Sequence, residues 1–164
     1  MKTVTLVRHA KSTKSMLNIR DIDRPLNERG YQDAYTVGQR LAEKHFTADL
    51  LISSPAIRAF STALIIADKL SYAENKIQLC KNLYETSPDD YIHEISLASD
   101  SANSVMLFGH NPTISEALTT LLKKGIDMGT SDIACIQFKI DSWENIFKAK
   151  GELVFYISPK DSDS

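Results

Sequence analysis

The stretch Val4–Lys11, VTLVRHAK, is the one from which we infer the fold. Residues Thr3–Val7 are β-branched or apolar, which predicts a strand, and Arg8 and His9 follow directly at its carboxyl end. Proteins with alternating strands and helices build their sites at the carboxyl ends of parallel strands. Two later stretches, 53–58 (SSPAIR) and 109–112 (GHNP), also place polar residues directly after a strand-like run. We therefore expect all three to meet at one edge of a sheet.

The bulk properties predict one ordinary domain. The chain has 164 residues, of which 43% are hydrophobic, enough to form a sizeable core. We expect this domain to cover residues 1–159 and the polar residues 160–164 to form a disordered tail. The net charge of -2 argues against a nucleic-acid partner, which usually requires a basic face.

Neither a membrane nor a secretory location is indicated. No apolar run reaches the length of a membrane span, and the short apolar run after Lys2 is interrupted by Arg8. Cys80 and Cys135 lack C-x-x-C spacing. We interpret both as reduced, buried residues of a cytoplasmic protein, with a redox or metal role as the alternative.

Alternating strands and helices predict the fold class. Helix starts are indicated by three cap candidates, Asn27, Ser54 and Asn111, the last two each followed by a proline. Expected strands lie at 3–7, 49–53, 76–80, 104–108, 133–140 and 153–157, and expected helices at 28–45, 55–70, 89–99 and 112–124. This order predicts a single three-layer α/β/α domain with a mostly parallel sheet. Because the last two strands follow each other without a helix, we expect an antiparallel edge.

Two arginines and two histidines are expected at the shared edge of this sheet: Arg8, His9, Arg58 and His110. Guanidinium groups present planar donors that match phosphate oxygens, and a helix start near Arg58 also favours an anion. No H-E-x-x-H motif, carboxylate at metal-ligand spacing or glycine-rich loop is present, so we expect no metal and no cofactor. The pattern indicates a phosphoryl site.

Neutral histidine is a competent nucleophile at pH 7. One of the two imidazoles would then carry the phosphoryl group as a phosphoramidate until water attacks it, while the other would stabilise the phosphate oxygens. Position along the strands does not tell which histidine attacks. Glu85 is the candidate for protonating the leaving group.

Six motifs in order carry a resemblance: LVRHAKS, DxxRPLNxRG, SSPAIRA with Thr62 shortly after, LYE, GHNP and the Thr-Ser pair at Thr130. Together they resemble the histidine phosphatase (phosphoglycerate mutase-like) superfamily, and in particular its small SixA-type phosphohistidine phosphatases. The resemblance implies a phosphoglycerate mutase-like fold and a phosphorylated nucleophile at His9. It also implies that Arg8, Arg58 and His110 complete the phosphate pocket, and that Glu85 stands at the place of the proton donor of larger relatives.

Two positions depart from the broader family. Ala10 stands where a glycine usually follows the Arg-His pair, and Ser15 stands where larger relatives often have an asparagine. Ser12 is the substitute candidate for a further phosphate contact. Arg24 is a second candidate for substrate contact, although a salt bridge to Asp21 that fixes the loop explains it as well.

Four other polar residues have a structural explanation as well as a functional one. Lys11 and Lys14 fit a solvated loop but also an acidic partner, and Thr130 and Ser131 fit a turn but also the pocket wall.

The short connection after Glu85 leaves no room for a large lid, which favours a phosphorylated protein as substrate. We therefore expect a metal-independent phosphatase that acts on protein phosphohistidine. The alternatives are a phosphatase for small phosphate esters, a non-catalytic phosphate-binding module, and a metal hydrolase that uses His9 and His110.

Overall fold

The structure is a computed structural model that describes residues 1–14 and 18–161. Its centre is a sheet in the order β3-β2-β4-β1-β5-β6. The strands are β1 (Lys2–Arg8), β2 (Leu50–Ser53), β3 (Gln78–Leu79), β4 (Ser104–Gly109), β5 (Ile133–Phe138) and β6 (Glu152–Ile157). The pairings of β1 with β4, β4 with β2 and β2 with β3 are parallel, whereas β5 is antiparallel to both β1 and β6. The predicted parallel sheet with an antiparallel edge is confirmed.

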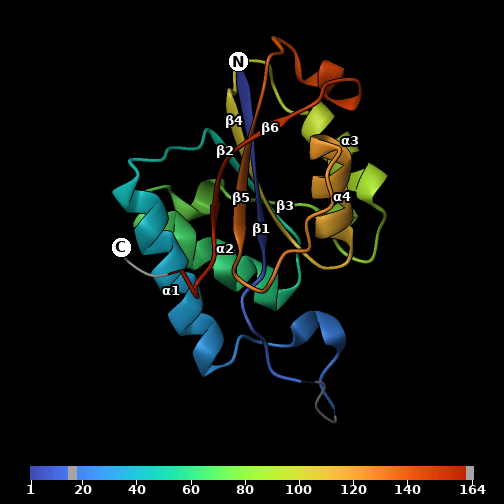
Figure 1. Cartoon of the computed structure of the whole chain (residues 1–164). Coiled ribbons are helices and arrows are strands. Elements are labelled where there is room, and N and C mark those ends of the chain that lie inside the picture. Colours follow the sequence, from blue (N-terminus) through green and yellow to red (C-terminus); the bar gives the residue numbers. More distant parts are fainter. Residues whose placement is uncertain (15–17, 162–164) are drawn as a thin grey trace.

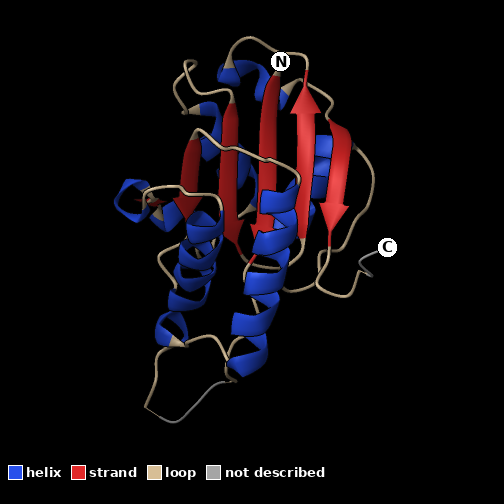
Figure 2. Ribbon diagram, turned by 90° about the vertical axis from the view of Figure 1, so that its left-hand side faces the viewer, coloured by secondary structure: helices blue, strands red, loops and turns tan. Residues whose placement is uncertain are grey.

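Helices cover both faces of the sheet, which gives the three expected layers (Figure 1). They are α1 (Glu28–Glu43), α2 (Ile57–Lys69), α3 (Pro88–Ser96) and α4 (Thr113–Leu122). Helices α1 and α2 pack together on one face, in front of the strands in Figure 2, and α3 and α4 pack together on the other. None of the helices in the described residues has the length and apolar character that a membrane span requires.

The central strands are apolar on both sides because both faces of the sheet are covered. In β4, Val105 and Leu107 belong to the core beneath α3 and α4, whereas Met106 and Phe108 belong to the core beneath α1 and α2. All four side chains are fully buried. This alternation fixes the register of β4, and a shift by one residue would exchange its two faces.

Several helix starts differ from the predicted ones. Helix α2 begins at Ile57 with Ala56 as its N-cap residue, so Ser54 is not a cap and Pro55 is not in the first turn. Helix α4 begins at Thr113, and the side chain of Asn111 accepts from the Ser115 hydroxyl instead of capping the helix. Both predictions were wrong because these side chains have other partners: the Ser54 hydroxyl lies 2.7 Å from Nε2 of His110, and the Asn111 amide donates to Asp127 and to the Met128 carbonyl.

Two further boundaries have local causes. Helix α3 begins at Pro88, one residue before the predicted start, because Ser87 and Asp90 form a capping box. Helix α4 ends at Leu122, and Lys123 rather than Gly125 takes the left-handed conformation with φ of 57°.

The chain end is partly anchored. Asp161 accepts from Arg40 through its carbonyl oxygen, and its side chain accepts from the backbone N–H of Ser158. The expected polar tail 160–164 is thus held as far as Asp161, and residues 162–164 lie outside the described residues, as does Ser15.

Candidate active site

The carboxyl ends of three parallel strands carry the candidate residues into one place. Arg8 is in register with Gly109, and the backbone N–H of His9 donates to the Gly109 carbonyl at 3.0 Å. As a result the imidazole rings of His9 and His110 lie with their centroids 5.2 Å apart. Because β2 pairs with β4 in parallel, Arg58 at the start of α2 reaches the same edge.

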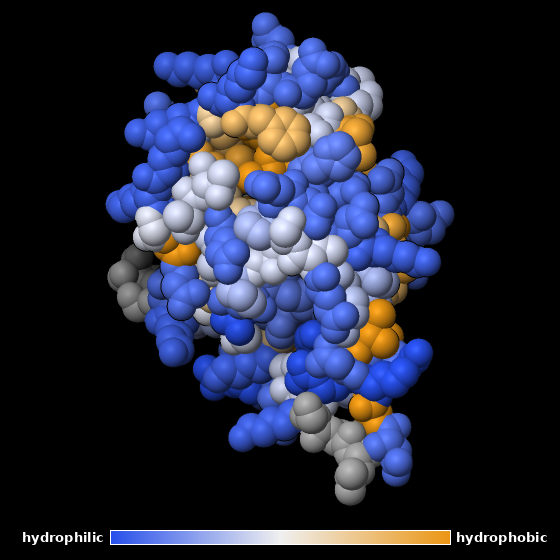
Figure 3. All heavy atoms as spheres, turned by 90° about the vertical axis from the view of Figure 1, so that its right-hand side faces the viewer, coloured by the Kyte–Doolittle hydropathy of each residue, from blue (hydrophilic) through white to orange (hydrophobic). Residues whose placement is uncertain are grey.

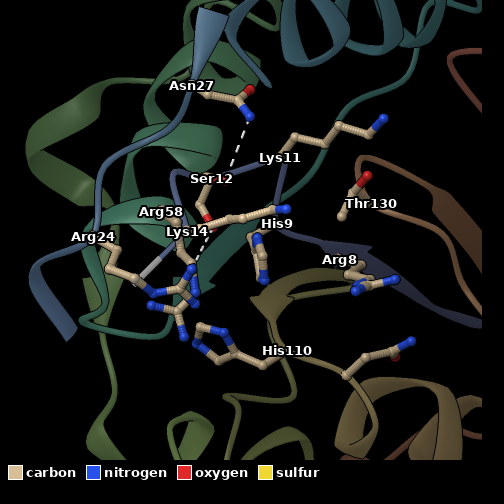
Figure 4. A pocket seen from close by; sticks show the side chains of 11 residues that line it. Arg8, His9, Lys11, Ser12, Lys14, Arg24, Asn27, Arg58, His110 and Thr130 are labelled. Atoms are coloured by element: carbon tan, nitrogen blue, oxygen red, sulfur yellow. Dashed lines mark hydrogen bonds between the residues drawn. The ribbon is translucent and has the colours of Figure 1, made fainter. Parts of the chain in front are cut away.

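A cavity of about 520 Å³ opens at this edge (Figure 4). The residues that line it are Arg8, His9, Lys11, Ser12, Lys14, Arg24, Asn27, Arg58, His110, Asn111 and Thr130. Six residues singled out for phosphate contact from the sequence are therefore together, and Thr130 is with them. Glu85 is not among the lining residues.

His9 is held in one tautomer. Its Nδ1 lies 2.7 Å from the carbonyl oxygen of Ala10, and since a carbonyl only accepts, Nδ1 carries the proton of the neutral ring. Nε2 then keeps its lone pair. Burial, followed by repulsion from Arg58, Arg8 and Arg24, lowers the pKa of His9 to about 4. The ring is therefore neutral at pH 7, as a nucleophile must be.

Thr62 holds the backbone of Ala10, the residue whose carbonyl orients His9. The Thr62 hydroxyl, fully buried, accepts from the N–H of Ala10 at 3.0 Å and donates to the carbonyl of Arg58 at 2.7 Å. The carbonyl of that same Ala10 residue receives Nδ1 of His9. Thr62 thus links the first turn of α2 to the backbone of Ala10, whose carbonyl assigns the tautomer of His9.

His110 is held by Ser54. Its Nε2 lies 2.7 Å from the Ser54 hydroxyl oxygen, which also accepts from the N–H of Ala56. A hydroxyl has one donor and two acceptor positions, so after accepting from Ala56 it can still either donate to Nε2 or accept from it. Nδ1 is buried and has no hydrogen-bond partner among the described residues. Burial, then His9 and Arg58, lowers the pKa of His110 to about 3.

Tyr91 holds the backbone of His110. Its hydroxyl accepts from the His110 N–H at 3.0 Å and donates to the carbonyl of Leu83 at 2.6 Å. A Cβ atom at Gly109 would lie 2.3 Å from this hydroxyl oxygen. The glycine of the GHNP motif is therefore required by close packing against Tyr91.

Arg8 is anchored on the antiparallel side of the cavity. Its NH1 donates to the carbonyl of Met128 at 2.8 Å, whereas its buried Nε has no partner in the described part of the chain. Burial lowers the pKa of Arg8, which the charges of Asp127 and Asp132 oppose. The guanidinium nevertheless stays charged at pH 7 because its intrinsic pKa is so high.

Arg58 is held by an internal anion that its predicted role did not include. It donates through NH1 to the backbone carbonyl of Asp21 at 2.7 Å and through NH2 to the Asp21 carboxylate at 3.0 Å. Since a guanidinium has five N–H donors, others remain for a ligand. The Nε of Arg58 is buried and has no partner within residues 1–14 and 18–161.

Asp21 organises this side of the site. Its carboxylate also accepts from the Tyr84 hydroxyl at 2.6 Å and from Nε of Arg24 at 3.0 Å. The Tyr84 hydrogen bond, followed by those from Arg58 and Arg24, lowers the pKa of Asp21 to about 2. The Tyr84 ring also packs edge-on against His110, with centroids 5.5 Å apart. No role is predicted for Tyr84 from the sequence, although it lies in the LYE motif.

Arg24 both fixes the loop and lines the cavity. Besides Asp21 it donates to the Thr13 carbonyl at 2.6 Å and to the Ser12 hydroxyl at 3.2 Å. The predicted salt bridge to Asp21 is confirmed at 3.0 Å. Arg24 therefore holds Ser12 at the cavity wall.

The remaining candidates, Glu85 and the two cysteines, are not among the residues that line the cavity. Glu85 is exposed, in the left-handed conformation with φ of 53°. Cys80 and Cys135 are unpaired. Within the part of the chain that the structure describes, no three His, Cys, Asp or Glu residues are grouped as ligands for a metal ion. Arg8, Arg24 and Arg58 line the cavity together with the two histidines, and their positive charges suit an anionic ligand.

Comparison with known proteins agrees with this geometry. The sequence model of the histidine phosphatase superfamily (branch 1) matches residues 4–95. An uncharacterized chloroplastic protein of Arabidopsis thaliana is 28% identical over 158 residues, covering 92% of this chain and 72% of its own length.

Solved structures show the same fold. The crystal structure of a candidate phosphohistidine phosphatase SixA from Agrobacterium tumefaciens is 26% identical, with a TM-score of 0.81 and coverage of 96% of this chain and 98% of the other. A protein histidine phosphatase SixA complexed with tungstate is 19% identical, with a TM-score of 0.82 and coverage of 96% and 97%. The predicted phosphoglycerate mutase-like fold is thereby confirmed.

Proposed function

The chain belongs to the histidine phosphatase superfamily (branch 1), and we propose that it is a phosphatase that uses Nε2 of His9 as the nucleophile. The observation that carries this proposal is the contact of 2.7 Å between Nδ1 of His9 and the Ala10 carbonyl. It leaves the lone pair on Nε2, in a ring whose pKa is lowered to about 4. A neutral, oriented imidazole beside two guanidinium groups is what transfer of a phosphoryl group to nitrogen requires.

Two steps complete the reaction. In the first, Nε2 of His9 forms a bond to phosphorus as the bond to the leaving group breaks, and the leaving group takes the electron pair. His9 then carries a positive charge that the Ala10 carbonyl stabilises through Nδ1–H. In the second, water attacks phosphorus, the bond to Nε2 breaks with its electron pair returning to His9, and inorganic phosphate leaves with the proton.

Three side chains around His9 would hold the phosphoryl oxygens. Arg8 and Arg58 neutralise their charge, and His110, in the tautomer in which Ser54 donates to its Nε2, offers its buried Nδ1–H as a further donor. These donors are fixed before the reaction by Met128, Asp21 and Ser54 respectively. Preorganised donors stabilise a transition state without the cost of reorienting them.

We propose protein phosphohistidine as the substrate. A phosphohistidine whose second ring nitrogen already carries a proton releases a neutral imidazole, whereas an ester must release a strongly basic alkoxide unless an acid protonates it, so a dedicated acid is less necessary. That agrees with the position of Glu85, which is exposed and outside the cavity wall. The proposal includes a reaction without a metal ion and a cytoplasmic location.

A substrate panel tests this proposal. The purified protein is offered a phosphohistidine protein, a phosphohistidine peptide and common phosphate esters, each with and without EDTA. We expect turnover of both phosphohistidine substrates at the highest kcat/KM, unaffected by the chelator and absent from His9→Ala. Preference for the esters would overturn the substrate class, and loss of activity in EDTA would overturn metal independence.

Hydrolysis of small phosphate esters is the second candidate, and the size of the cavity favours it. A volume of about 520 Å³ exceeds what a phosphoryl group needs and falls in the range of sites for small molecules. A non-catalytic phosphate-binding module would bind phosphate but fail to turn over any member of the panel.

A further inference from the structure

The cavity wall carries two lysines that the proposed chemistry does not use. Lys11 and Lys14 line the cavity together with the phosphate-site residues, and both are exposed at its mouth (Figure 4). Neither side chain forms a hydrogen bond or an ion pair with any residue that the structure describes. Their charges are therefore available to a ligand.

The nearby carboxylate does not cancel these charges. Asp21 is already engaged by Arg24, Arg58 and the hydroxyl of Tyr84. The whole chain has a net charge of -2, yet this one rim collects Lys11, Lys14 and Arg24 around the inner arginines. Figure 3 shows mostly hydrophilic side chains, with a few hydrophobic ones among them, at the lower end of the molecule. Concentrated positive charge on an acidic protein attracts anionic partners.

The backbone that carries Lys11 is fixed in place. The Lys11 carbonyl accepts from the N–H of Asn27 at 3.0 Å, and Ser12 pairs with Leu26 in an antiparallel bridge. Gly30 permits this approach, because a Cβ atom there would lie 2.0 Å from the Lys11 carbonyl oxygen. The N–H of Thr13 donates to the carbonyl of Pro25, which continues the anchor to the residue before Lys14. The segment that carries the two ammonium groups is thus held in place by backbone hydrogen bonds.

We infer that Lys11 and Lys14 form a second anion subsite that binds acidic side chains flanking the phosphorylated residue of a protein substrate. This inference rests on the proposed phosphatase function and specifies its substrate. Exposed lysines on a loop are usually only solvated. Here they border a cavity that is larger than a phosphoryl group, and they extend the positive surface outward from it. A protein surface supplies a phosphohistidine and acidic neighbours together, whereas inorganic phosphate supplies one anion only.

Two phosphohistidine peptides of equal length test the subsite. One carries Asp and Glu on both sides of the phosphohistidine, and the other carries Asn and Gln. We expect wild-type protein to prefer the acidic peptide in kcat/KM at low salt by about 2- to 5-fold per lysine, as for exposed ion pairs. The preference should shrink in 0.5 M salt because exposed charges are screened.

Variants assign the preference to these lysines. Lys11→Gln/Lys14→Gln should bring the ratio of kcat/KM for acidic over neutral peptide close to one, and Lys11→Glu/Lys14→Glu should invert it. The matched control is Lys139→Gln/Lys150→Gln, which removes two lysines from a separate surface pocket and should keep the wild-type ratio.

The outcomes separate this inference from the proposed function. Equal kcat/KM of wild-type protein on the two peptides, or a variant that loses both activities in proportion, would overturn the subsite while the phosphatase stands. A carboxylate-bearing small ester preferred over the acidic peptide would overturn its assignment to a protein surface. No turnover of either peptide or of any ester would overturn the proposed function itself.

Discussion

Replacing Thr62 with valine tests whether its hydroxyl positions the Ala10 backbone that orients His9. Valine has nearly the shape of threonine but lacks the hydroxyl, which accepts from the N–H of Ala10 at 3.0 Å and donates to the carbonyl of Arg58 at 2.7 Å. The Ala10 N–H would then be buried without an acceptor. Such a donor costs about 1–3 kcal/mol of folding stability. For a domain of this size, that lowers Tm by roughly 2–12 °C.

Thr62→Val should lower kcat even where the protein remains folded. If the backbone at Ala10 shifts, Nδ1 of His9 loses the acceptor that assigns its proton. A fraction of the rings would then carry the proton on Nε2 and be inactive. We expect kcat on a phosphohistidine peptide to fall about tenfold, equivalent to about 1.4 kcal/mol, at a temperature where the variant remains folded.

Thr62→Ser is the matched control because it keeps the hydroxyl and removes only a methyl group. Thermal unfolding followed by circular dichroism gives Tm, and initial rates at saturating substrate give kcat. Serine should restore kcat to within a few-fold of wild type even if Tm stays lower. Wild-type kcat in the valine variant, or failure of serine to rescue it, would refute the positioning role.

Three further predictions follow from the site. The native pKa values of His9 and His110, about 4 and about 3, lie below the ordinary 6.5, so between these values the unfolded chain binds more protons. The free energy of unfolding should therefore fall as pH falls from 6.5 toward 4, by up to about 1.4 kcal/mol per pH unit for each histidine; equal urea midpoints at pH 7 and pH 5 would contradict this. Arg58→Ala should raise the inhibition constant of inorganic phosphate about 10- to 100-fold through loss of a charged hydrogen bond, and an unchanged constant would remove Arg58 from the phosphate site. Glu85→Gln should leave phosphohistidine hydrolysis within about twofold, since Glu85 is exposed outside the cavity, and a large loss would restore it as the general acid.

The parallel strands were predictable because their sequences are apolar on both faces. Val105–Phe108 alternates between two cores, and a run of that kind fits only a strand covered on both sides. Once the strands are parallel, their carboxyl ends share an edge. The meeting of His9 with His110 follows from the topology alone.

The helix starts after β2 and β4 were less predictable. Ser54 and Asn111 are good cap residues in isolation, but Ser54 holds His110 and Asn111 interacts with Ser115. A sequence pattern does not show which of two competing partners such a side chain takes. The capping box has a recognisable sequence pattern, because Ser87 is followed by a proline and, three residues later, by the acidic Asp90.

The support of Arg58 could not be predicted from spacing. Asp21 lies 37 residues before it in a loop without a hydrophobic period, and Tyr84 lies 63 residues after Asp21. No local pattern links residues so far apart. The same is true of the Thr62 hydroxyl, whose contact with Ala10 spans 52 residues.

Trapping the covalent intermediate tests the nucleophile at His9 most directly. The protein is mixed with a ³²P-labelled phosphohistidine peptide, quenched in alkali within milliseconds, digested and mapped by mass spectrometry. We predict an acid-labile, alkali-stable label on Nε2 of His9, absent from His9→Ala and retained at a lower level in His110→Ala. Label on His110 or on a hydroxyl side chain, or turnover by His9→Ala at a rate near wild type, would contradict this assignment.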